Sequence, residues 1–515
     1  MEMIELRASA RHAVEDPTLT YRQRVQALAG VAESALEPAP VSDACAAALA
    51  DRVICDMYEG NAPYRPRYAL PDYEKAIQQG SEFLELEPPR TLDDALTFLL
   101  CMYGNVPSIT GYPVWLGDVD SLLLPFVSGI DADDLRQRLR RHWIVLDRLF
   151  PDAFTHANLG PIDNRVARAV LAVQRDVRQV VPNLTLKVDP DTTPDELLLD
   201  AMRTMVVAAQ PHLVNHPMMV SDLGPRYGVV SCYNSLPVGG GSHTLVRLNL
   251  KEAALRHSGP AGRFVTDTLP RYVELTAELM ESRIRHLVER ARFFDHSWLV
   301  AEGLLDIDRF SAMFGLIGLA ECVQVLLDAD GVHARYGHDE VADELSYDIV
   351  QACSRMVAAR PMPYCEGFGG RAMLHSQAGI ESDKDVTVGT RVPVGDEPEL
   401  YRHLRTVAPH HVWFPSGVSD IVHLDETVAG NVQAAVDIAK GALRLGMRDV
   451  TFNVADNEFV RITGYLVRKR DVAMIAEGAR HSSTVLGAGS IEGMHLDDRR
   501  VQRVRSHELE AGAAR

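Results

Sequence analysis

The spacing of apolar residues along the chain predicts long helices. Residues 22–36 place apolar side chains near the 3.6-residue period of one helix face, and Pro38 and Pro40 end the pattern. The same period recurs through much of the remaining chain. We therefore expect further helices at residues 133–150, 164–181, 194–209, 265–292, 308–328, 339–359 and 428–445.

Short runs of β-branched and apolar residues lie between the expected helices. Most are apolar on both faces, which is typical of strands buried in a sheet that helices cover. Long helices that alternate with such strands favour an α/β fold and are compatible with closure into a barrel. The expected strands are Leu184–Val188, Met218–Ser221, Gly228–Cys232, Thr244–Leu250, His411–Phe414 and Asp449–Val454.

Composition and charge exclude several classes of protein. The 515 residues include 52 Lys+Arg and 71 Asp+Glu, a net charge of −19, so the phosphates of a nucleic acid would repel this chain. No apolar run reaches the ~18 residues of a membrane span, and no signal segment is visible. The seven cysteines are widely spaced and contain no Cys-x-x-Cys pair. We expect a cytoplasmic protein with reduced thiols that binds neither membrane nor nucleic acid.

The segment that ends on Cys232, Tyr227-Gly-Val-Val-Ser-Cys, is the first candidate for chemistry. The chain runs from there into three glycines, 239–241, and His243. A cysteine in this setting is commonly a core residue beside a tight turn. The glycines lack the Gly-Lys-Ser/Thr that completes a phosphate-binding loop. A thiolate nucleophile would need a base such as His243 to fold back onto Cys232, and the sequence leaves that open.

The second candidate is the segment Arg461-Ile-Thr-Gly464-Tyr465. Its surroundings alternate like a strand, and an isolated glycine in a strand usually marks a bulge or a close approach of another backbone. Taken alone, the segment is unremarkable. It becomes informative together with the Cys232 segment.

The two segments together resemble the signatures of the glycyl radical enzymes. Arg461-Ile-Thr-Gly464-Tyr465 matches their C-terminal signature, Arg-Val/Ile-x-Gly-Tyr/Phe, at each fixed place. The Cys232 segment resembles the cysteine loop of pyruvate formate-lyase through Gly239 and on to Arg247-Leu-Asn-Leu. In its length and in the residues of its motifs, the chain most resembles the short YjjI-type family, and the resemblance extends along most of the chain.

The resemblance implies an α/β fold with a ten-stranded β/α barrel of the glycyl radical enzyme type. It implies three regions, with the cysteine loop and the glycine loop meeting inside the barrel. These regions are a helical N-terminal region (1–95), the barrel (96–480) with its Cys loop (227–243) and Gly radical loop (457–468), and a C-terminal extension (481–515).

The same resemblance assigns the two catalytic residues. Gly464 would store the radical, because two flanking amides stabilise an unpaired electron on a planar glycine α carbon that a side chain would crowd. Cys232 would form the thiyl radical that takes hydrogen from the substrate, which requires a dry, neutral pocket. A separate S-adenosylmethionine-dependent iron–sulfur enzyme would create the radical on Gly464, and this chain itself would hold no metal.

Departures from the better-known members narrow the reaction. Ser231 stands where pyruvate formate-lyase has a second cysteine, which disfavours acyl transfer through a thioester. Asn234 stands where the dehydratases have the glutamate of Cys-x-Glu, and an amide cannot take a proton. No cysteine follows Cys365, so the C-terminal zinc site of anaerobic ribonucleotide reductase is missing.

Five residues are candidates for binding the substrate, each with an ordinary structural role as the alternative. Arg247 matches a position that the resemblance assigns to carboxylate binding, for which a planar guanidinium is suited. Asn234 and His243 are near Cys232 in sequence, where they would orient a hydroxyl or carbonyl. Glu366 and His423 are candidates for the missing base.

We therefore expect a lyase or dehydratase of a small, polar, carboxylated compound, acting as a homodimer. The first alternative is pyruvate formate-lyase-like C–C cleavage of a 2-keto acid that uses Ser231 or no covalent intermediate. The second is a radical-free scaffold or binding protein that kept the barrel. A cysteine or metal hydrolase is the third, and it alone predicts an enzyme that works in air.

Overall fold

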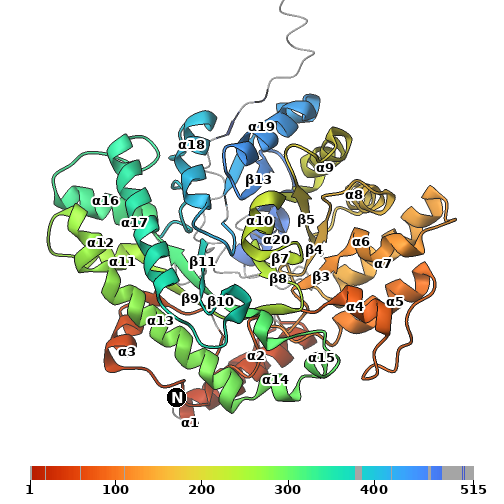
Figure 1. Cartoon of the computed structure of the whole chain (residues 1–515), viewed down its shortest axis with the longest axis horizontal. Coiled ribbons are helices and arrows are strands. Elements are labelled where there is room, and N and C mark those ends of the chain that lie inside the picture. Colours follow the sequence, from red (N-terminus) through yellow and green to blue (C-terminus); the bar gives the residue numbers. More distant parts are fainter. Residues whose placement is uncertain are drawn as a thin grey trace, which may run out of the picture.

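The computed structural model surrounds a central set of strands with helices (Figure 1). It describes residues 3–17, 19–57, 59–109, 111–376, 386–418, 420–461, 466–477, 501–502 and 504. This arrangement confirms the expected α/β class. Among the described helices, none combines the length and the apolar character that a membrane crossing requires.

The bounds of the helices agree in large part with the periodicity of the sequence. Their first turns are capped as helix propensities require: Thr91 and Asp94 form a capping box at α5, and Asn164 accepts two backbone N–H groups at α8. The helices are α1 (Met3–Glu15), α2 (Tyr21–Ser34), α3 (Asp43–Ala50), α4 (Tyr73–Gln79), α5 (Leu92–Tyr103), α6 (Val119–Leu123), α7 (Ala132–Leu149), α8 (Arg165–Val177), α9 (Asp195–Ala208), α10 (His216–Leu223), α11 (Leu250–Leu255), α12 (Phe264–Asp267), α13 (Leu269–Arg285), α14 (Phe293–His296), α15 (Trp298–Ala301), α16 (Leu319–Ala329), α17 (Glu340–Ala359), α18 (Leu400–His411), α19 (Val432–Arg444) and α20 (Lys469–Ala476).

One sheet has the order β12-β13-β6-β5-β4-β3. Its strands β3 to β6 run parallel, and β13 joins β6 in the antiparallel direction. Helices α6 to α9 and α19 lie on its outer side (Figure 1). The strands are β3 (Trp115–Asp118), β4 (His156–Leu159), β5 (Asn183–Val188), β6 (His212–Asn215), β12 (Ile421–Leu424) and β13 (Asp449–Val454).

The second sheet is built around the long strand β9. Strands β9, β10 and β11 are parallel, and the short strands β1 and β2 pair antiparallel with β9. Helices α11, α13, α16 and α17 cover this sheet (Figure 1). Its strands are β1 (Ile54–Cys55), β2 (Tyr68–Leu70), β9 (Gly240–Asn249), β10 (Phe310–Ile317) and β11 (Met373–Ser376).

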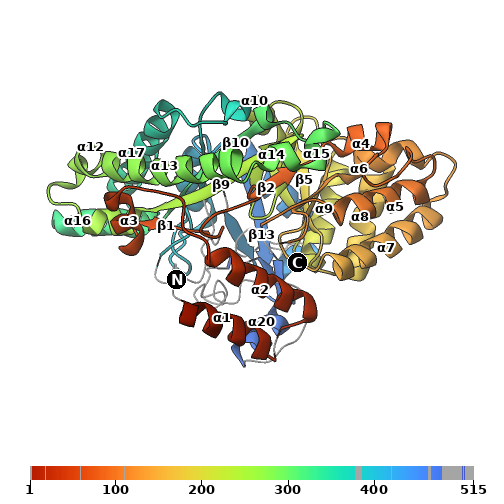
Figure 2. The ribbon, with the colours of Figure 1, turned by 90° about the horizontal axis from the view of Figure 1, so that it is seen from below.

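The strand pairs among the described residues leave these as two separate sheets, so closure into a ten-stranded barrel stays a prediction. The N-terminal region, for which we expected helices, holds α1 to α4 and also the short strands β1 and β2, which pair with β9. Helices α1 and α2 pack on each other below the sheets (Figure 2). The region is therefore continuous with the sheet that it adjoins.

Three local predictions are wrong. Residues 310–317 form strand β10 and not the start of a helix at 308–328. Met218–Ser221 belongs to helix α10, and His411–Phe414 contains the end of α18 and a turn. The physical reason is shared: a short run that is apolar at nearly every position fits a buried strand and a buried helix equally well.

Candidate active site

Cys232 lies at the tip of a β-hairpin. Strand β7 (Tyr227–Val230) pairs antiparallel with β8 (Asn234–Pro237), and the last pair joins Val230 to Asn234. Only three residues connect the strands. Ser231 and Tyr233 both take positive φ angles, 52° and 66°, to make the turn. The side chain of Cys232 is thereby held in the interior, 5% exposed.

The hairpin is fastened to both sheets. Asn158 on β4 binds the backbone of Val229 through two hydrogen bonds of 2.8 Å, donating with its amide nitrogen and accepting with its oxygen. Lys187 on β5 donates to the carbonyl of Tyr227 at 2.8 Å. On the other side, the backbone N–H of Ser235 donates to the carbonyl of Ser416, which follows α18, and the N–H of Ser416 donates to the carbonyl of Leu374 on β11 of the second sheet. These contacts place the hairpin between the sheets (Figure 1).

An apolar cluster surrounds Cys232 and includes residues on both sides of the glycine segment. Strand β14 (Phe459–Arg461) pairs antiparallel with β15 (Leu466–Arg468), and Arg461 is opposite Leu466. Gly464 itself lies outside the described residues. The members of the cluster are Ala153, Val180, Val181, Ala209, Cys232, Val388, Phe459, Val460, Leu466 and Val467. The two signature segments are therefore neighbours in one dry part of the core.

Arg461 joins the two segments directly. Its fully buried guanidinium donates to the hydroxyl of Tyr233 at 3.3 Å, to the side-chain oxygen of Asn183 at 3.0 Å and to the carbonyl of Ala209 at 2.7 Å. The side chain of Asn453 on β13 pairs with both backbone groups of Arg461. Burial lowers the pKa of Arg461. Three neutral acceptors thus hold a buried cation in place.

The pocket of Cys232 is dry but not free of charge. Arg391, which sequence analysis missed, is 4% exposed, and its charge acts on both Cys232 and Tyr233. Burial lowers the pKa of Arg391, and the nearby carboxylate of Asp420 opposes that shift.

A chain of hydrogen bonds leads to the sulfur of Cys232. The amide nitrogen of Asn234 lies 3.5 Å from the hydroxyl of Tyr68 on β2, and that hydroxyl donates to the hydroxyl of Ser231 at 3.2 Å. Ser231 in turn donates to the sulfur at 3.8 Å. Ser231, which stands in place of a second cysteine, therefore links the sulfur to a tyrosine from a distant part of the chain.

Of the predicted substrate-binding residues, Asn234 lies beside Cys232, whereas Arg247 lies on β9 and is also fully buried. Arg247 donates to the backbone carbonyl of Asp56 at 2.9 Å. Its neighbour on β10 is Gly315, and a Cβ atom there would come within 2.6 Å of the Arg247 side chain. On β11 the neighbour of Gly315 is His375. Because Gly315 has no side chain, it leaves room beside β10 for the side chain of Arg247.

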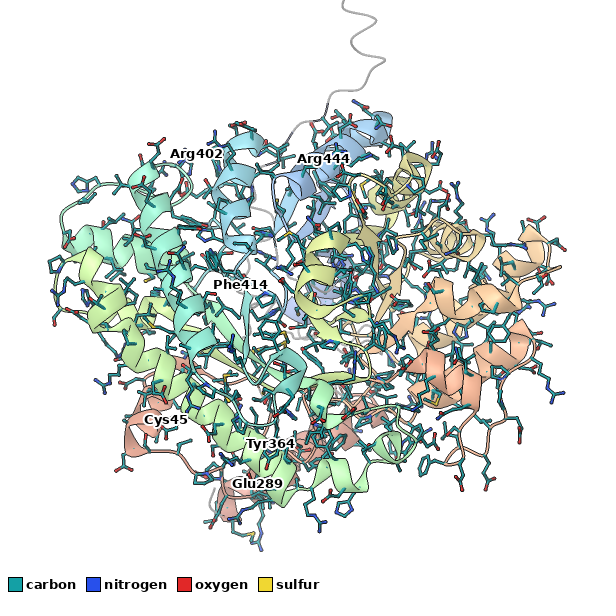
Figure 3. The ribbon with its side chains drawn as sticks, in the orientation of Figure 1. Cys45, Glu289, Tyr364, Arg402, Phe414 and Arg444 are labelled. Carbon is teal, nitrogen blue, oxygen red and sulfur yellow. The ribbon has the colours of Figure 1, made fainter. Side chains whose placement is uncertain are left out.

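The other three candidates lie in different surroundings. His243 donates from Nε2 to the carbonyl of Tyr364 at 2.7 Å and packs beside Phe294 and Phe310. The Tyr364 hydroxyl donates to Glu289 near the edge of the molecule (Figure 3). Burial lowers the pKa of His243 to about 4. These contacts explain His243 as a neutral residue that packs between β9 and α14.

Glu366 lies in a single turn of 3-10 helix with an exposed side chain, so the structure does not bring it together with the buried Cys232. His423 lies on β12 and is paired in register with Asn453, which holds Arg461. It is half-buried. Of the two candidate bases, His423 is the one on the sheet that carries the glycine-side contacts.

The three glycines at 239–241, within the Cys loop, serve strand packing. A Cβ atom on Gly240 would lie 2.1 Å from the carbonyl oxygen of Arg309, and one on Gly241 would lie 2.0 Å from that of Tyr68. Gly239 has a positive φ of 75°. Side chains at Gly240 and Gly241 would therefore separate β9 from its neighbours, which is a sufficient reason for the glycines without a phosphate.

A cavity among the described residues lies at the base of the hairpin and not at its tip. It has a volume of about 670 Å³ and is lined in part by Trp115, Asp118 and Arg226. No group of three or more His, Cys, Asp or Glu side chains among the described residues is placed to hold a metal ion.

Two mainly parallel sheets with a cysteine hairpin between them, next to the strands that bound Arg-Ile-Thr-Gly-Tyr, are the features of a glycyl radical enzyme. The family model "Glycyl radical enzyme YjjI-like" matches residues 19–502, and the chain belongs to this family. The uncharacterized protein YjjI of Escherichia coli (strain K12) is 45% identical over 98% of this chain and 97% of its own.

Solved structures show the same fold at low sequence identity. Hydroxyproline dehydratase from Clostridioides difficile has a TM-score of 0.67 at 13% identity, over 96% of this chain and 88% of its own. A structure on 1,2-propanediol dehydration in Roseburia inulinivorans has a TM-score of 0.68 at 11% identity, with the same coverage. These structural similarities concern the fold, and the family that the two sequence segments indicated is confirmed by the family model and by the relative from Escherichia coli.

Proposed function

We propose that this protein is a glycyl radical lyase or dehydratase that acts on a small polar, hydroxylated and carboxylated compound. In this proposal Gly464 stores the unpaired electron, and Cys232 is the residue that takes a hydrogen atom from the substrate. The observation that carries it is the position of Cys232, which shares one apolar cluster with the strands on both sides of the glycine segment. Arg461 of that segment binds Tyr233, the residue after Cys232.

The proposed mechanism passes single hydrogen atoms between Gly464, Cys232 and the substrate, with one bond-breaking step on the substrate radical. Cys232 gives its sulfur-bound hydrogen to the Gly464 α carbon and becomes a thiyl radical, which then takes a hydrogen atom from a substrate carbon. The substrate radical loses water or breaks a C–C or C–O bond, and the product radical takes the hydrogen back from Cys232. A buried sulfur suits this chemistry, because neither a thiolate nor water takes part.

The reaction type follows from what replaces the reactive groups of related enzymes. Ser231 provides a hydroxyl in place of a second cysteine, and its hydrogen bonds go to Tyr68 and Cys232, which supports elimination over thioester formation. Two solved structures of this fold concern dehydration, of hydroxyproline and of 1,2-propanediol. C–C cleavage of a 2-keto acid and a radical-free scaffold are the alternatives.

The proposal includes the partners that the chemistry requires. A separate S-adenosylmethionine-dependent iron–sulfur enzyme removes the first hydrogen from Gly464, so that this chain needs no metal of its own. We further propose that the protein works as a homodimer in the cytoplasm, and that Arg247 binds the substrate's carboxylate with His423 near the reacting groups.

The test is a screen of activated protein against small hydroxy acids, 2-keto acids and polyols under strict exclusion of oxygen, followed by mass spectrometry. We expect one hydroxylated compound to be consumed by the wild type and by neither Cys232→Ala nor Gly464→Ala. Consumption by Gly464→Ala, or undiminished activity in air, would contradict the radical mechanism. Consumption of a 2-keto acid alone would favour the C–C cleavage alternative.

A further inference from the structure

Tyr68 is the residue near Cys232 that no sequence signature indicates. It comes from strand β2, far from both signatures, and pairs in register with Ser242 on β9. Its side chain is 3% exposed, and its hydroxyl contacts Ser231 and Asn234, the residues on either side of the Cys232–Tyr233 tip. The Tyr68 phenol is thus one hydrogen-bond partner, Ser231, away from the sulfur of Cys232.

Asn234 supplies the second observation. Its side-chain oxygen is buried and has no hydrogen-bond partner, although the residue is fully enclosed. The orientation of the amide is determined by the carbonyl of Val230, because a carbonyl accepts only and must face the amide nitrogen, 3.1 Å away. A buried acceptor without a donor is unfavourable. It indicates a partner that brings a hydrogen, such as a hydroxyl group.

We propose that Tyr68 and Asn234 together bind a hydroxyl group of the substrate. The Tyr68 hydroxyl turns from Ser231 to donate to the substrate's oxygen, and the Asn234 side-chain oxygen accepts the substrate's hydroxyl hydrogen. This inference rests on the proposed function and specifies its substrate class: an alcohol whose hydroxyl is on, or next to, the carbon that loses hydrogen to Cys232.

The chemistry of the pair selects an uncharged group. Burial raises the pKa of Tyr68, so the phenol keeps its proton and remains a donor. The oxygen of Asn234 can only accept, and a carboxylate has no hydrogen to offer it. A carboxylate of the same substrate would therefore bind elsewhere, as proposed for Arg247. The hydroxyl and the carboxylate of one substrate would thus bind at two different places in the protein.

The experiment measures binding to the unactivated protein, so that it does not depend on the radical. Isothermal titration compares trans-4-hydroxy-L-proline with L-proline and 1,2-propanediol with 1-propanol, since the members of each pair differ in one hydroxyl. We expect at least one hydroxylated member to bind roughly 5- to 150-fold more tightly than its counterpart. Tyr68→Phe should remove that preference while the affinity for the other member stays the same.

Tyr73→Phe is the matched control, because the Tyr73 hydroxyl is also buried and donates to a backbone carbonyl, that of Trp115, at 3.0 Å. It should keep the preference. If Tyr68→Phe does not fold, Asn234→Leu replaces it and should lose the preference equally. Equal binding within both pairs, failure of both hydroxylated probes to bind, or an unchanged preference in the folded variant would overturn the proposal.

The failure of this inference is distinguishable from the failure of the proposed function. Electron spin resonance of activated Tyr68→Phe reports the radical on Gly464 independently of the substrate, and its yield should equal that of the wild type. A normal radical in the wild type without any hydroxyl preference would contradict the role of Tyr68 and Asn234 and leave the proposed function intact. Absence of any radical in the wild type would contradict the proposed function.

Discussion

The guanidinium of Arg461 lies 3.3 Å from the hydroxyl of Tyr233 and donates a hydrogen bond to it. Both side chains are fully buried, and the hydroxyl of Tyr233 also contacts Thr451 on β13 at 2.9 Å. Tyr233 is adjacent to Cys232, and Arg461 begins the segment that contains Gly464. Arg461, the first residue of the glycine signature, therefore has a structural role: it fixes the position of the glycine segment relative to the cysteine hairpin.

A double-mutant cycle measures this contact. Tyr233→Phe and Arg461→Lys should each lower the free energy of unfolding, because each leaves buried polar groups without partners, at a cost of about 1–3 kcal/mol. Their effects should be non-additive by about 0.5–3 kcal/mol, as is typical of residues in contact. Urea denaturation of the two single variants and the double variant gives the coupling.

Tyr103 provides the control for the cycle. Its buried hydroxyl donates to the carbonyl of Leu116 and has no part in the Arg461 contacts. Tyr103→Phe combined with Arg461→Lys should be additive within about 0.5 kcal/mol. An equal coupling in both cycles would show that the effect on stability is general and that the Arg461–Tyr233 contact has no special role.

Gly315→Ala tests the packing of Arg247. The added methyl group would lie 2.6 Å from Cγ of Arg247 and 3.2 Å from the side chain of Leu245, so one of them must move. We expect the free energy of unfolding to fall by about 1–3 kcal/mol, as for overpacked cores. Gly441→Ala in α19 is the control: no heavy atom lies within 4 Å of its Cβ position, and it should stabilise by about 0.5–1 kcal/mol. An unaffected Gly315→Ala would contradict the assigned packing.

Arg247→Lys tests the proposed carboxylate site. An ammonium lacks the two parallel donors of a guanidinium, so the affinity for a carboxylated substrate should fall by about 1.5–3 kcal/mol, or roughly 10- to 150-fold. The yield of the glycyl radical should be unchanged, because the radical is on another segment. Steady-state kinetics and spin counting measure the two quantities. Turnover of a neutral polyol that Arg247→Lys leaves unaffected would end the carboxylate hypothesis while the radical mechanism remains.

Acid should destabilise the protein through its buried histidines. Burial lowers the pKa of His243 and of His142 to about 4, from an ordinary value of about 6.5. Between these values the unfolded chain binds more protons than the folded one, so the free energy of unfolding is greatest above about pH 6.5 and falls as the pH decreases toward 4. Each histidine contributes a slope of up to about 1.4 kcal/mol per pH unit.

Denaturation at a series of pH values, with two histidine variants, isolates one such contribution. His243→Gln retains a side-chain donor for the carbonyl of Tyr364, so it should fold and show a shallower dependence on pH. His333→Gln, at an exposed position, should match the wild type. Identical slopes for all three proteins would show that His243 is not buried in its neutral form.

The periodic pattern of the sequence was sufficient for the α/β class and for several elements, because long amphipathic helices and strands such as β5 and β13 are determined by local alternation. It failed at β10 and at the short apolar run Met218–Val220 of α10, where only the tertiary contacts decide between helix and strand. Sheet pairing across long separations, such as β2 with β9, has no local signal at all.

In the candidate site, too, the residues with a local sequence signal were predicted and those placed by tertiary contacts were not. The Cys232 segment and the glycine segment were recognised because each is a short motif of consecutive residues. Tyr68 and Arg391 were missed, because each is a single residue that reaches the hairpin through the fold. Glu366 was a candidate from composition only, and its exposure follows from a short turn that no pattern reveals. A polar side chain becomes a site residue through burial and neighbours, which local sequence does not encode.

The central claim is that one hydrogen atom moves between Gly464 and Cys232, and electron spin resonance in deuterated water tests it most directly. Activated wild type should show the doublet of a glycyl radical with one α hydrogen. This doublet should collapse to a singlet in deuterated water, because the Cys232 sulfur exchanges its hydrogen with solvent and passes deuterium to the glycine. Cys232→Ala should form the radical and keep the doublet. A doublet that collapses equally fast in Cys232→Ala, or a radical that persists in Gly464→Ala, would contradict the account.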